Sequence, residues 1–443
     1  MTVLVAPIGP RRHAPTGDVP PASGGTTSPV DWAHGALALI VIAWLNTGVA
    51  AQAVSQVPGW ARWALLSGWL VIALLRDPAY GSRLVWLGWP VIFLLGYGFV
   101  VQALGGVSLV PYLYGLAYLG AVVAIYVYYA EPRLRPLQIA LIGFLVIDYV
   151  IVGVNTFRSL GTDPMLARYL ATSAETRAEV LEGQQYFGVG GYAYAYVLGA
   201  VVVMAGALAL YRRRGRVLSL IVAGAAALLV VRASFAIAIV LAVCVLAALV
   251  VSRPLAGRSK MLSLVAGLAA IGAVATFSGP LLEAMARADW MPSLVAARLQ
   301  ELSGTLSGAS GGPGFLLGSR LSLYGDSVET FTRFPVFGGA ASPDAAIVVG
   351  GHSSWLDLLA VFGLPAVVLV VFLVRAFKVS AAHVGVDGRA ALAAVWVYFL
   401  LLGLVNPLLF ANLLLAWFLG LPLLGQLLQP SVTEVPASPA DVS

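Results

Sequence analysis

The chain is built from a series of apolar stretches, each long enough to form a helix that crosses a lipid bilayer. Such a helix needs about 20 mostly apolar residues, and stretches of this kind recur along most of the sequence. Apolar and aromatic residues make up 60% of the 443 residues, whereas charged residues make up 10%. Soluble proteins carry about 25% charged residues, so this composition excludes a water-facing globular surface. The sequence predicts an all-α polytopic membrane protein.

The positions of the apolar stretches predict about twelve transmembrane helices. They cover residues 35–55, 60–75, 84–104, 110–129, 137–155, 190–211, 217–232, 234–251, 261–280, 353–377, 390–405 and 412–428. We expect residues 217–251 to form two short helices separated at Arg232, because the stretch is too long for one span. Residues 35–428 then form one transmembrane domain. Residues 1–34, rich in Pro, Gly and Thr at their start, and residues 429–443 are expected to be tails.

The basic residues predict how the spans are oriented. Most of the 25 Lys and Arg residues fall in the amino-terminal tail and in one set of alternate connections, and the short connections of the other set are nearly uncharged. Because Lys and Arg gather on the cytoplasmic side of membrane proteins, we expect both tails to be cytoplasmic. Two long loops, residues 156–189 and 281–352, are then expected to face outward.

Several classes of function are disfavoured by what the sequence lacks. Its two lysines, Lys260 and Lys378, lie outside any GxxxxGK[ST] sequence, so the chain has no P-loop of its own. The four dispersed histidines and the single Cys244 match no zinc motif, and no DxD pair of acids is present. We therefore expect no metal ion and no other cofactor. The basic residues are scattered between apolar runs, which also argues against a nucleic-acid partner.

Charged residues in or beside the spans are candidates for function, because charge inside a bilayer is costly. Arg232 interrupts LLVVRASFAIAIV, either as an interfacial arginine at a helix turn or as a fixed cation for an anionic ligand. Asp148 and Asp357 are the notable acids within the spans, and each either joins helices or belongs to a site. Arg158, in the first outward loop, is a further candidate contact for an anion.

The second outward loop holds more candidates. Its segment RLSLYGDSVETFTRFPVFGGA predicts a short helix that starts at Arg320 and ends before Pro335. Arg320 and Tyr324 share a face of this helix because they are four residues apart, and Arg333 lies near its end. Residues 308–312 match the GxSxG pattern, but no strand precedes them and no helix follows, so we interpret the match as accidental.

The same loop closes with GGHSSWLDLLAVFGLPA, in which His352 stands at the start of the next span. An interfacial histidine is either structural or catalytic. Ser353 or Ser354 is expected to cap the helix that follows. Asp357 is five residues further on, about 140° round the helix, so we do not expect it to orient His352 directly.

Three patterns, in this order along the chain, resemble the bacterial O-antigen ligase and polysaccharide polymerase family. VVRASFAIAIVLA is similar to the arginine-bearing helix start of that family, and RLSLYGDSVETFTRFPVFGGA to its outer-loop pattern of an arginine, an aromatic residue and a Pro-x-x-Gly end. GGHSSWLDLLAVFGLPA is similar to its histidine-containing segment. The sequence departs from the family pattern at Val231, where Ser is usual, at Ser353, where Asn is commoner, and at Pro365, which replaces a glycine.

The resemblance implies a membrane glycosyltransferase at the outer face of the bacterial inner membrane. Its donor would be a glycan linked to undecaprenyl diphosphate, its acceptor a hydroxyl of a glycan or lipid, and neither metal nor nucleotide would be needed. Arg232 and Arg320 would hold the diphosphate, and His352 would act beside the reacting centre as a base or by positioning the acceptor. Further substrate contacts would come from Arg158, Tyr324 and Arg333. A flippase and a chain-length regulator of the same pathway would be partners, with membrane lipids around the spans.

Three functions remain open from the sequence. A polymerase that joins repeat units is favoured, because HSSWLDLL resembles exopolysaccharide polymerases. A ligase that attaches finished glycan to a lipid or protein acceptor is the nearest alternative. The third is a secondary transporter with twelve spans. Transporters usually contain paired repeats and carry their essential charges near the middle of the membrane, whereas the halves of this chain do not resemble each other.

Overall fold

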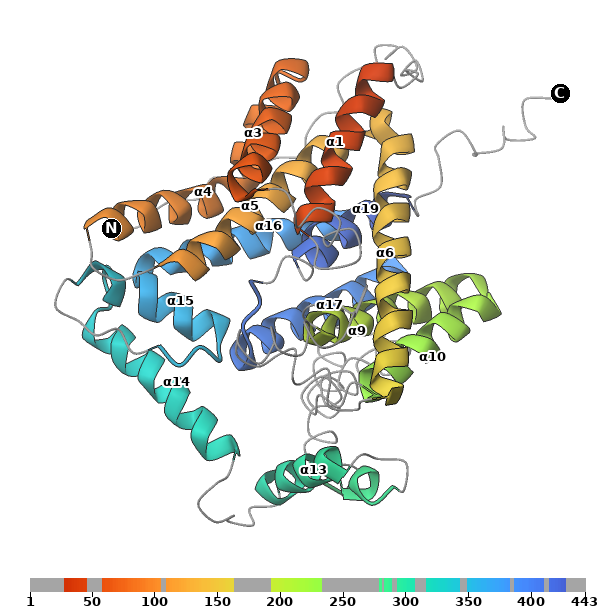
Figure 1. Ribbon diagram of the computed structural model, residues 1–443, viewed down its shortest axis with the longest axis vertical. Helices are drawn as coiled ribbons and strands as arrows, with labels where there is room; N and C mark the ends of the chain where they lie inside the picture. Colours follow the sequence, from red (N-terminus) through yellow and green to blue (C-terminus); the bar gives the residue numbers. More distant parts are fainter. Residues whose placement is uncertain are drawn as a thin grey trace, which may run out of the picture.

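Helices make up almost all of the chain that the structure describes. The computed structural model describes residues 28–45, 58–104, 109–162, 193–232, 279–280, 283–288, 293–306, 316–342, 349–382, 386–409 and 414–427. Figure 1 shows these helices, and no β-strand occurs within the described ranges. The all-α prediction is therefore confirmed for this part of the chain.

The α-helices named along the chain range from 7 to 28 residues in length. In chain order they are α1 (Pro29–Leu45), α3 (Gly59–Arg76), α4 (Tyr80–Leu104), α5 (Val110–Tyr129), α6 (Arg135–Thr162), α9 (Ala193–Arg214), α10 (Val217–Arg232), α13 (Ser293–Leu306), α14 (Leu316–Arg333), α15 (Ser354–Phe362), α16 (Val368–Ala382), α17 (Val386–Val405) and α19 (Leu421–Leu427). Short 3-10 turns are η1 (Pro132–Leu134), η3 (Gly339–Ala341) and η4 (Leu364–Val367), and η5 (Ala416–Gly420) is a π-helical turn.

Four helical segments in the described residues are long and apolar enough to cross a membrane. They are Tyr80–Leu104, Val110–Tyr129, Pro132–Gly161 and Leu364–Ala382. Five shorter apolar helices accompany them: Pro29–Leu45, Gly199–Leu208, Val217–Val230, Leu392–Val405 and Ala416–Leu427. The chain thus carries helices of the kind found in membrane proteins.

Several predicted spans coincide with helices. The prediction 110–129 matches α5 at both ends, and the prediction 217–232 matches the start of α10 at Val217. The described part of α10 reaches Arg232, and the residues after it lie outside the described part. The first span, predicted at 35–55, begins earlier, since α1 starts at Pro29 and the described helix reaches Leu45. The predicted tail 1–34 is therefore too long. Residues 46–57, 163–192 and 233–278 lie outside the described part, and with them the predicted spans 234–251 and most of 261–280.

Two predicted boundaries are wrong for identifiable reasons. The predicted span 353–377 is two helices, because α15 ends at Phe362 and Gly363 takes a positive φ of 65° that an L residue rarely adopts. Pro365 then starts η4 without a backbone donor. The first outward loop, predicted to begin at residue 156, is still helical to Thr162, so Arg158 lies on α6 instead of in a loop.

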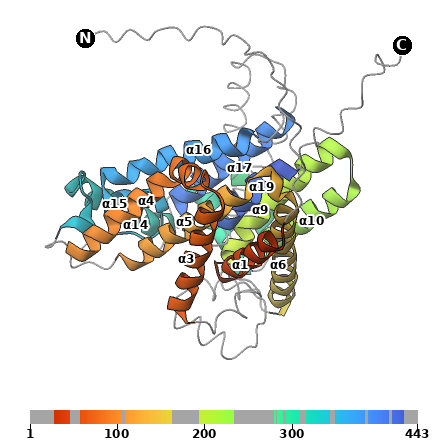
Figure 2. The same cartoon turned by 90° about the horizontal axis from the view of Figure 1, so that it is seen from above.

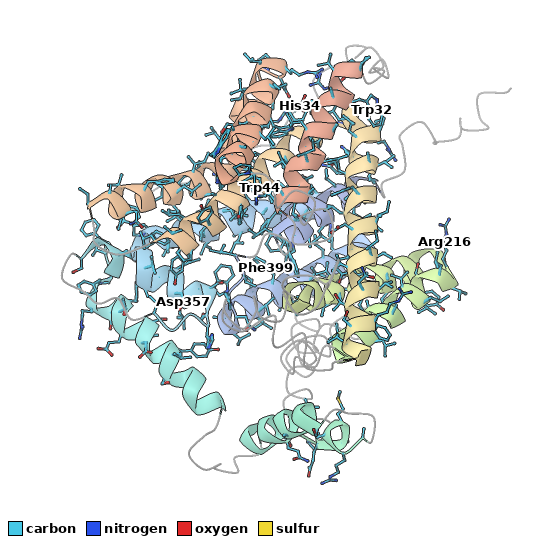
Figure 3. The ribbon with its side chains drawn as sticks, in the orientation of Figure 1. Trp32, His34, Trp44, Arg216, Asp357 and Phe399 are labelled. Atoms are coloured by element: carbon cyan, nitrogen blue, oxygen red, sulfur yellow. The ribbon has the colours of Figure 1, made fainter. Side chains whose placement is uncertain are left out.

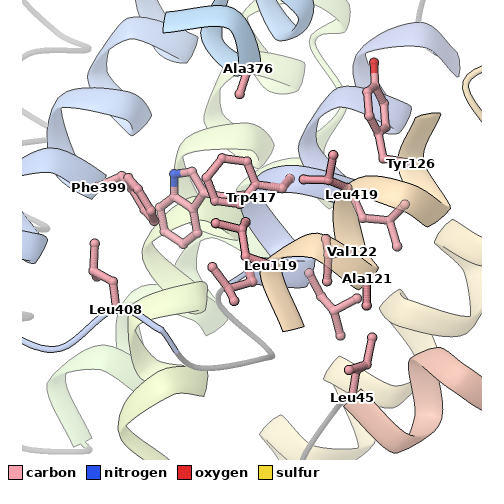
Figure 4. Close-up of a cluster of buried hydrophobic side chains, with 14 of the residues drawn as sticks. Leu45, Leu119, Ala121, Val122, Tyr126, Ala376, Phe399, Leu408, Trp417 and Leu419 are labelled. Atoms are coloured by element: carbon pink, nitrogen blue, oxygen red, sulfur yellow. The ribbon is translucent and has the colours of Figure 1, made fainter. Parts of the chain in front are cut away.

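The core is a continuous cluster of aromatic and aliphatic side chains between α5, α17 and the end of the chain. Figure 4 shows Trp417 and Phe399 beside Leu119 and Leu419, all of them buried. The ring centroids of Phe399 and Trp417 are 5.3 Å apart. Helix α17 packs against α15, α16 and α9, so it connects the α14–α15 part of the molecule to the α9–α10 part, which lie on opposite sides in Figure 2.

An ion-pair network lies at the start of α4. Arg83 bonds to Asp77 at 2.5 Å and to Glu131 at 2.5 Å, and Arg133 lies 3.8 Å from Asp77. Asp77 also accepts the backbone N–H of Ala79 at 3.0 Å. The network therefore ties the connection between α3 and α4 to the connection between α5 and α6. We call this end of α4 the Arg83 end.

Asp77→Asn is expected to destabilise the Arg83 end by about 1–2 kcal/mol, less than a fully buried pair because Arg83 is partly exposed and keeps Glu131. The thermal unfolding midpoint of the detergent-solubilised protein should fall by about 2–8 °C. Glu329→Gln is the matched control, because its pair with Arg333 is exposed on both sides and should contribute less than about 0.5 kcal/mol. Equal midpoints for the two variants would contradict the prediction.

Candidate functional site

Helices α14 and α15 pack against each other at the end of α4 opposite the Arg83 end. The Tyr97 hydroxyl donates to the carbonyl oxygen of Phe337, which follows α14, at 2.5 Å. Tyr97 lies about 21 Å along α4 from Arg83, at 1.5 Å per residue. Figure 3 shows Asp357 of α15 in the left part of the view and His34 of α1 near its top. We call this region the α14–α15 junction.

Two glycine turns lock the junction together. Gly338 and Gly363 both have positive φ values, 78° and 65°. A Cβ on Gly338 would overlap the carbonyl of Val361, and a Cβ on Gly363 would overlap the amide of Gly338 and lie 2.7 Å from the oxygen of Pro335. The amide of Leu364 donates to that same Pro335 oxygen at 2.8 Å. The Pro-x-x-Gly end of the α14 segment is therefore docked on the turn after α15.

A buried polar cluster lies between the two helices. The Ser327 hydroxyl of α14 donates to Oδ1 of Asp357 of α15 at 2.6 Å and accepts the backbone N–H of Gly350 at 3.0 Å. Oδ2 of Asp357 accepts the backbone N–H of Ser353 at 3.3 Å. Ser327, Ser353 and Asp357 are all at most 3% exposed. The carboxylate is thus neighboured by hydrogen-bond donors from α14 and from the segment that precedes α15.

His352 stands between the two anchored residues of this segment. Its side chain is exposed, and Nδ1 lies 3.1 Å from the carbonyl oxygen of Gly351. Gly350 rests on the backbone of α14, because a Cβ there would overlap the carbonyl of Leu323. Gly351 takes a positive φ of 69° with open space around it. An accessible imidazole is therefore carried on a short segment, residues 350–353, that touches α14.

The start of α15 is also fixed to α17. Ser353 is the N-cap that the sequence predicted at Ser353 or Ser354, because its hydroxyl oxygen accepts the N–H of Leu356 at 3.3 Å. The Ser353 hydroxyl is 3.2 Å from the carbonyl oxygen of Gly403, and the Ser354 hydroxyl accepts the N–H of Leu408 at 2.6 Å. These contacts anchor the carboxyl end of the segment 350–353 and the start of α15 to α17 and to the residues that follow it.

Three of the predicted substrate contacts lie on α14. The helix begins one turn before the predicted start and ends before Pro335, as expected. Tyr324 is half-buried, and Arg320 precedes it by one turn on the same face by register. Arg333 is exposed at the end of the helix and pairs with Glu329 at 3.3 Å. Arg320 and Tyr324 therefore lie on α14, the helix against which the His352 segment packs.

The remaining two predicted residues lie elsewhere. Arg232 is the last residue of α10, and Arg158 is exposed one turn before the end of α6, a helix that α10 contacts. Figures 1 and 2 both show α10 on the side of the molecule away from α14. The predicted site residues thus form two groups, one at the α14–α15 junction and one at the ends of α6 and α10.

The two described histidines contrast sharply. His34 is buried, its ring stacks on Trp69 with centroids 5.0 Å apart, and Nε2 lies 3.1 Å from the carbonyl oxygen of Trp69. The Tyr129 hydroxyl lies 3.3 Å from Nδ1 of His34. His34 is therefore a packed structural side chain, whereas the exposed ring of His352 can meet a substrate.

Sequence reasoning missed Ser327, which joins Asp357 to the His352 segment. Its spacing could have identified it, because Ser327 follows Arg320 by seven residues, two helical turns, and therefore lies on the same helix face. Asp148, the other acid singled out from the sequence, is buried on α6. No group of three or more His, Cys, Asp or Glu side chains suited to a metal ion occurs among the described residues.

Comparison with known proteins adds no assignment. No protein-family model matches this chain, and no curated protein matches it.

Proposed function

We propose that the chain is a membrane glycosyltransferase that moves a glycan from undecaprenyl diphosphate to a hydroxyl of an acceptor. The observation that carries the proposal is the α14–α15 junction, where an exposed histidine sits on a segment packed against the helix of Arg320 and Tyr324. The resemblance of the same two segments to the O-antigen ligase and polysaccharide polymerase family supports it.

The proposed topology has about twelve spans in the bacterial inner membrane. The Arg83 end, with Arg133 beside it, belongs to the basic set of connections and would face the cytoplasm. The α14–α15 junction, at the other end of α4, would then face outward, together with the two long loops. A donor with a polyprenyl tail would keep its tail among the membrane lipids and present its head group at the junction.

The proposed reaction breaks the bond between the anomeric carbon and the diphosphate oxygen and forms a bond from that carbon to the acceptor oxygen. The leaving diphosphate gains negative charge, which arginine side chains stabilise by paired hydrogen bonds. Arg320 is proposed for this role at the junction. Arg232, which lies apart from it at the end of α10, is proposed as a second contact for the anionic donor. His352 would take the proton of the acceptor hydroxyl or orient that hydroxyl. This chemistry needs neither metal nor nucleotide.

Polymerisation of repeat units is the favoured form of this activity, with a flippase and a chain-length regulator as partners. A ligase would use the same donor chemistry with a lipid or protein acceptor. The transporter remains the alternative of a different class. It would depend on Asp148, within the predicted span that α6 covers, and not on the exposed His352.

The proposed function is tested by complementation in a strain that lacks the gene. We expect His352→Ala, Arg320→Ala and Arg232→Ala each to abolish long-chain surface polysaccharide while single repeat units still reach the surface. The reason is that each variant removes a group proposed to act on the substrate, His352 and Arg320 at the α14–α15 junction and Arg232 in the separate group at the ends of α6 and α10. Surface glycan is analysed by gel electrophoresis after membrane levels of each variant have been matched.

Arg287→Ala is the control, because Arg287 is exposed in the turn after the helical residues 283–286, pairs with Glu283, and has no proposed role. Long chains that remain unattached in the three variants would assign the protein as a ligase. Wild-type polysaccharide in all three, with loss in Asp148→Asn, would exclude the transferase and favour the transporter.

A further inference from the structure

The buried Asp357 raises a question that the proposed chemistry does not answer. Burying a carboxylate is costly, and well-packed apolar residues often join helices with equal or greater stability. Yet Asp357 is only 3% exposed at the contact between α14 and α15. Its described hydrogen bonds go to Ser327 and to the N–H of Ser353, the residue after His352. The carboxylate is therefore used to hold a segment of backbone as well as to join two helices.

Ser327 completes the same arrangement on the other side of His352. Its hydroxyl donates to Asp357 at 2.6 Å and accepts the N–H of Gly350 at 3.0 Å. Gly350 lies two residues before His352 and Ser353 lies directly after it. The amides of Gly350 and Ser353, on the two sides of His352 along the chain, are thus tied to a single carboxylate, the first through Ser327 and the second directly. The backbone of Gly351 also bonds to this carboxylate.

The position held in this way is close to the helix of Arg320. Gly350 contacts α14 at the carbonyl of Leu323, next to Tyr324 and one turn beyond Arg320. The Ser353 hydroxyl lies 3.2 Å from the carbonyl of Gly403 and so anchors the carboxyl end of the segment to α17. The backbone of His352 is therefore immobilised while its imidazole stays exposed.

We infer that Ser327 and Asp357 are positioning residues for His352, acting through the backbone of residues 350–353. They hold the histidine beside the face of α14 that carries Arg320. The acceptor hydroxyl at His352 and the leaving diphosphate at Arg320 are then held in a fixed alignment. This inference rests on the proposed function. It differs from orientation of the imidazole by a hydrogen bond from Asp357, because the hydrogen bonds run to the backbone of Gly350 and Ser353. The charge of Asp357 also acts on the His352 ring, and Ser327→Ala leaves that charge in place.

The test measures turnover of an undecaprenyl-diphosphate-linked oligosaccharide by the full-length protein in lipid nanodiscs. For Ser327→Ala we expect kcat per folded molecule to fall by about 10²-fold, since a displacement of about 1 Å has this effect on well-aligned reactions. The KM for the donor should stay within about threefold, because the cations proposed to bind the donor are unchanged. Amide hydrogen exchange of residues 349–353 should become faster.

Thr332→Ala is the matched control, because Thr332 is exposed on the same helix and its hydroxyl donates within α14, to the carbonyl oxygen of Glu329 at 2.9 Å. It should leave kcat and exchange at wild-type values. If Ser327→Ala does not fold, Ser327→Cys and Asp357→Asn replace it. Both keep the side-chain volume and weaken the hydrogen bonds, and each should lower kcat by about tenfold.

The outcomes separate the two claims. If the wild type turns over the donor but the Ser327 and Asp357 variants keep its kcat per folded molecule, the positioning role is wrong and the proposed function stands. If these variants lower only the amount of folded protein, the positioning role is also wrong, because that result is expected of contacts that serve stability alone. If the wild type itself does not use the lipid-linked donor, the proposed function is overturned and the inference goes with it.

Discussion

Arg320→Ala is expected to lower the kcat/KM of the purified protein for a lipid-linked glycan donor by about 10³-fold. Removing one preorganised donor that meets developing negative charge typically costs a factor of about 10²–10³, and an arginine that binds phosphate oxygens through two hydrogen bonds lies at the upper end. By helical register Arg320 shares a face of α14 with Tyr324 and Ser327. That face leads to the segment of His352, so the loss should appear in turnover and not in folding.

Arg320→Lys distinguishes charge from geometry. A lysine keeps the charge but offers a point-like ammonium in place of the planar fork, so it should restore only about a tenth of the wild-type kcat/KM. Arg287→Ala, which replaces an exposed arginine in the turn after residues 283–286, should behave like the wild type. A full rescue by lysine would mean that Arg320 acts only through its charge. If Arg320→Ala keeps wild-type kinetics, Arg320 does not bind the donor and the proposed site on α14 is wrong.

The helices could be predicted from sequence wherever an apolar run is bounded by polar or helix-breaking residues. Helix α5 and the start of α10 are predicted to the residue for this reason. The break at Gly363 was missed, because Gly and Pro occur within many transmembrane helices and the apolar pattern continues on both sides. What decides the break is the docking of this turn on Gly338, a contact that periodicity within one segment does not contain.

The candidate site could likewise be predicted only where local sequence patterns contain it. His352 and Arg320 stand out in local patterns, and the spacing of Arg320 and Tyr324 gives their shared helix face. The partnership of Ser327 with Asp357 joins residues 30 positions apart. It depends on how α14 packs against α15, which no local pattern encodes.

Gly338→Ala and Gly363→Ala are expected to prevent stable folding of the α14–α15 junction. Each position has a positive φ, 78° and 65°, which costs an alanine about 1 kcal/mol or more. Each methyl group would also overlap backbone atoms of the facing turn, and backbone cannot rotate away as a flexible side chain can. Together these effects should destabilise the protein by about 3 kcal/mol or more.

Two other glycines of the same region separate the cost of backbone strain from the cost of steric overlap. Gly351 also has a positive φ, 69°, but no atom lies within 4 Å of a Cβ placed there. Gly351→Ala should therefore cost about 1 kcal/mol. Gly325→Ala lies within α14 with open space around it and should be neutral or slightly stabilising, because alanine favours a helix.

The measurement is the yield of monodisperse protein in mild detergent, followed by its thermal unfolding midpoint. We expect the midpoints to rank Gly325→Ala highest, then Gly351→Ala, then the two docking glycines, whose yield should be below about a tenth of the wild type. Gly338→Ala and Gly363→Ala should not add when combined, because they break one shared contact. Midpoints for these two variants equal to that of Gly351→Ala would mean that strain alone matters, and that the two turns are not docked.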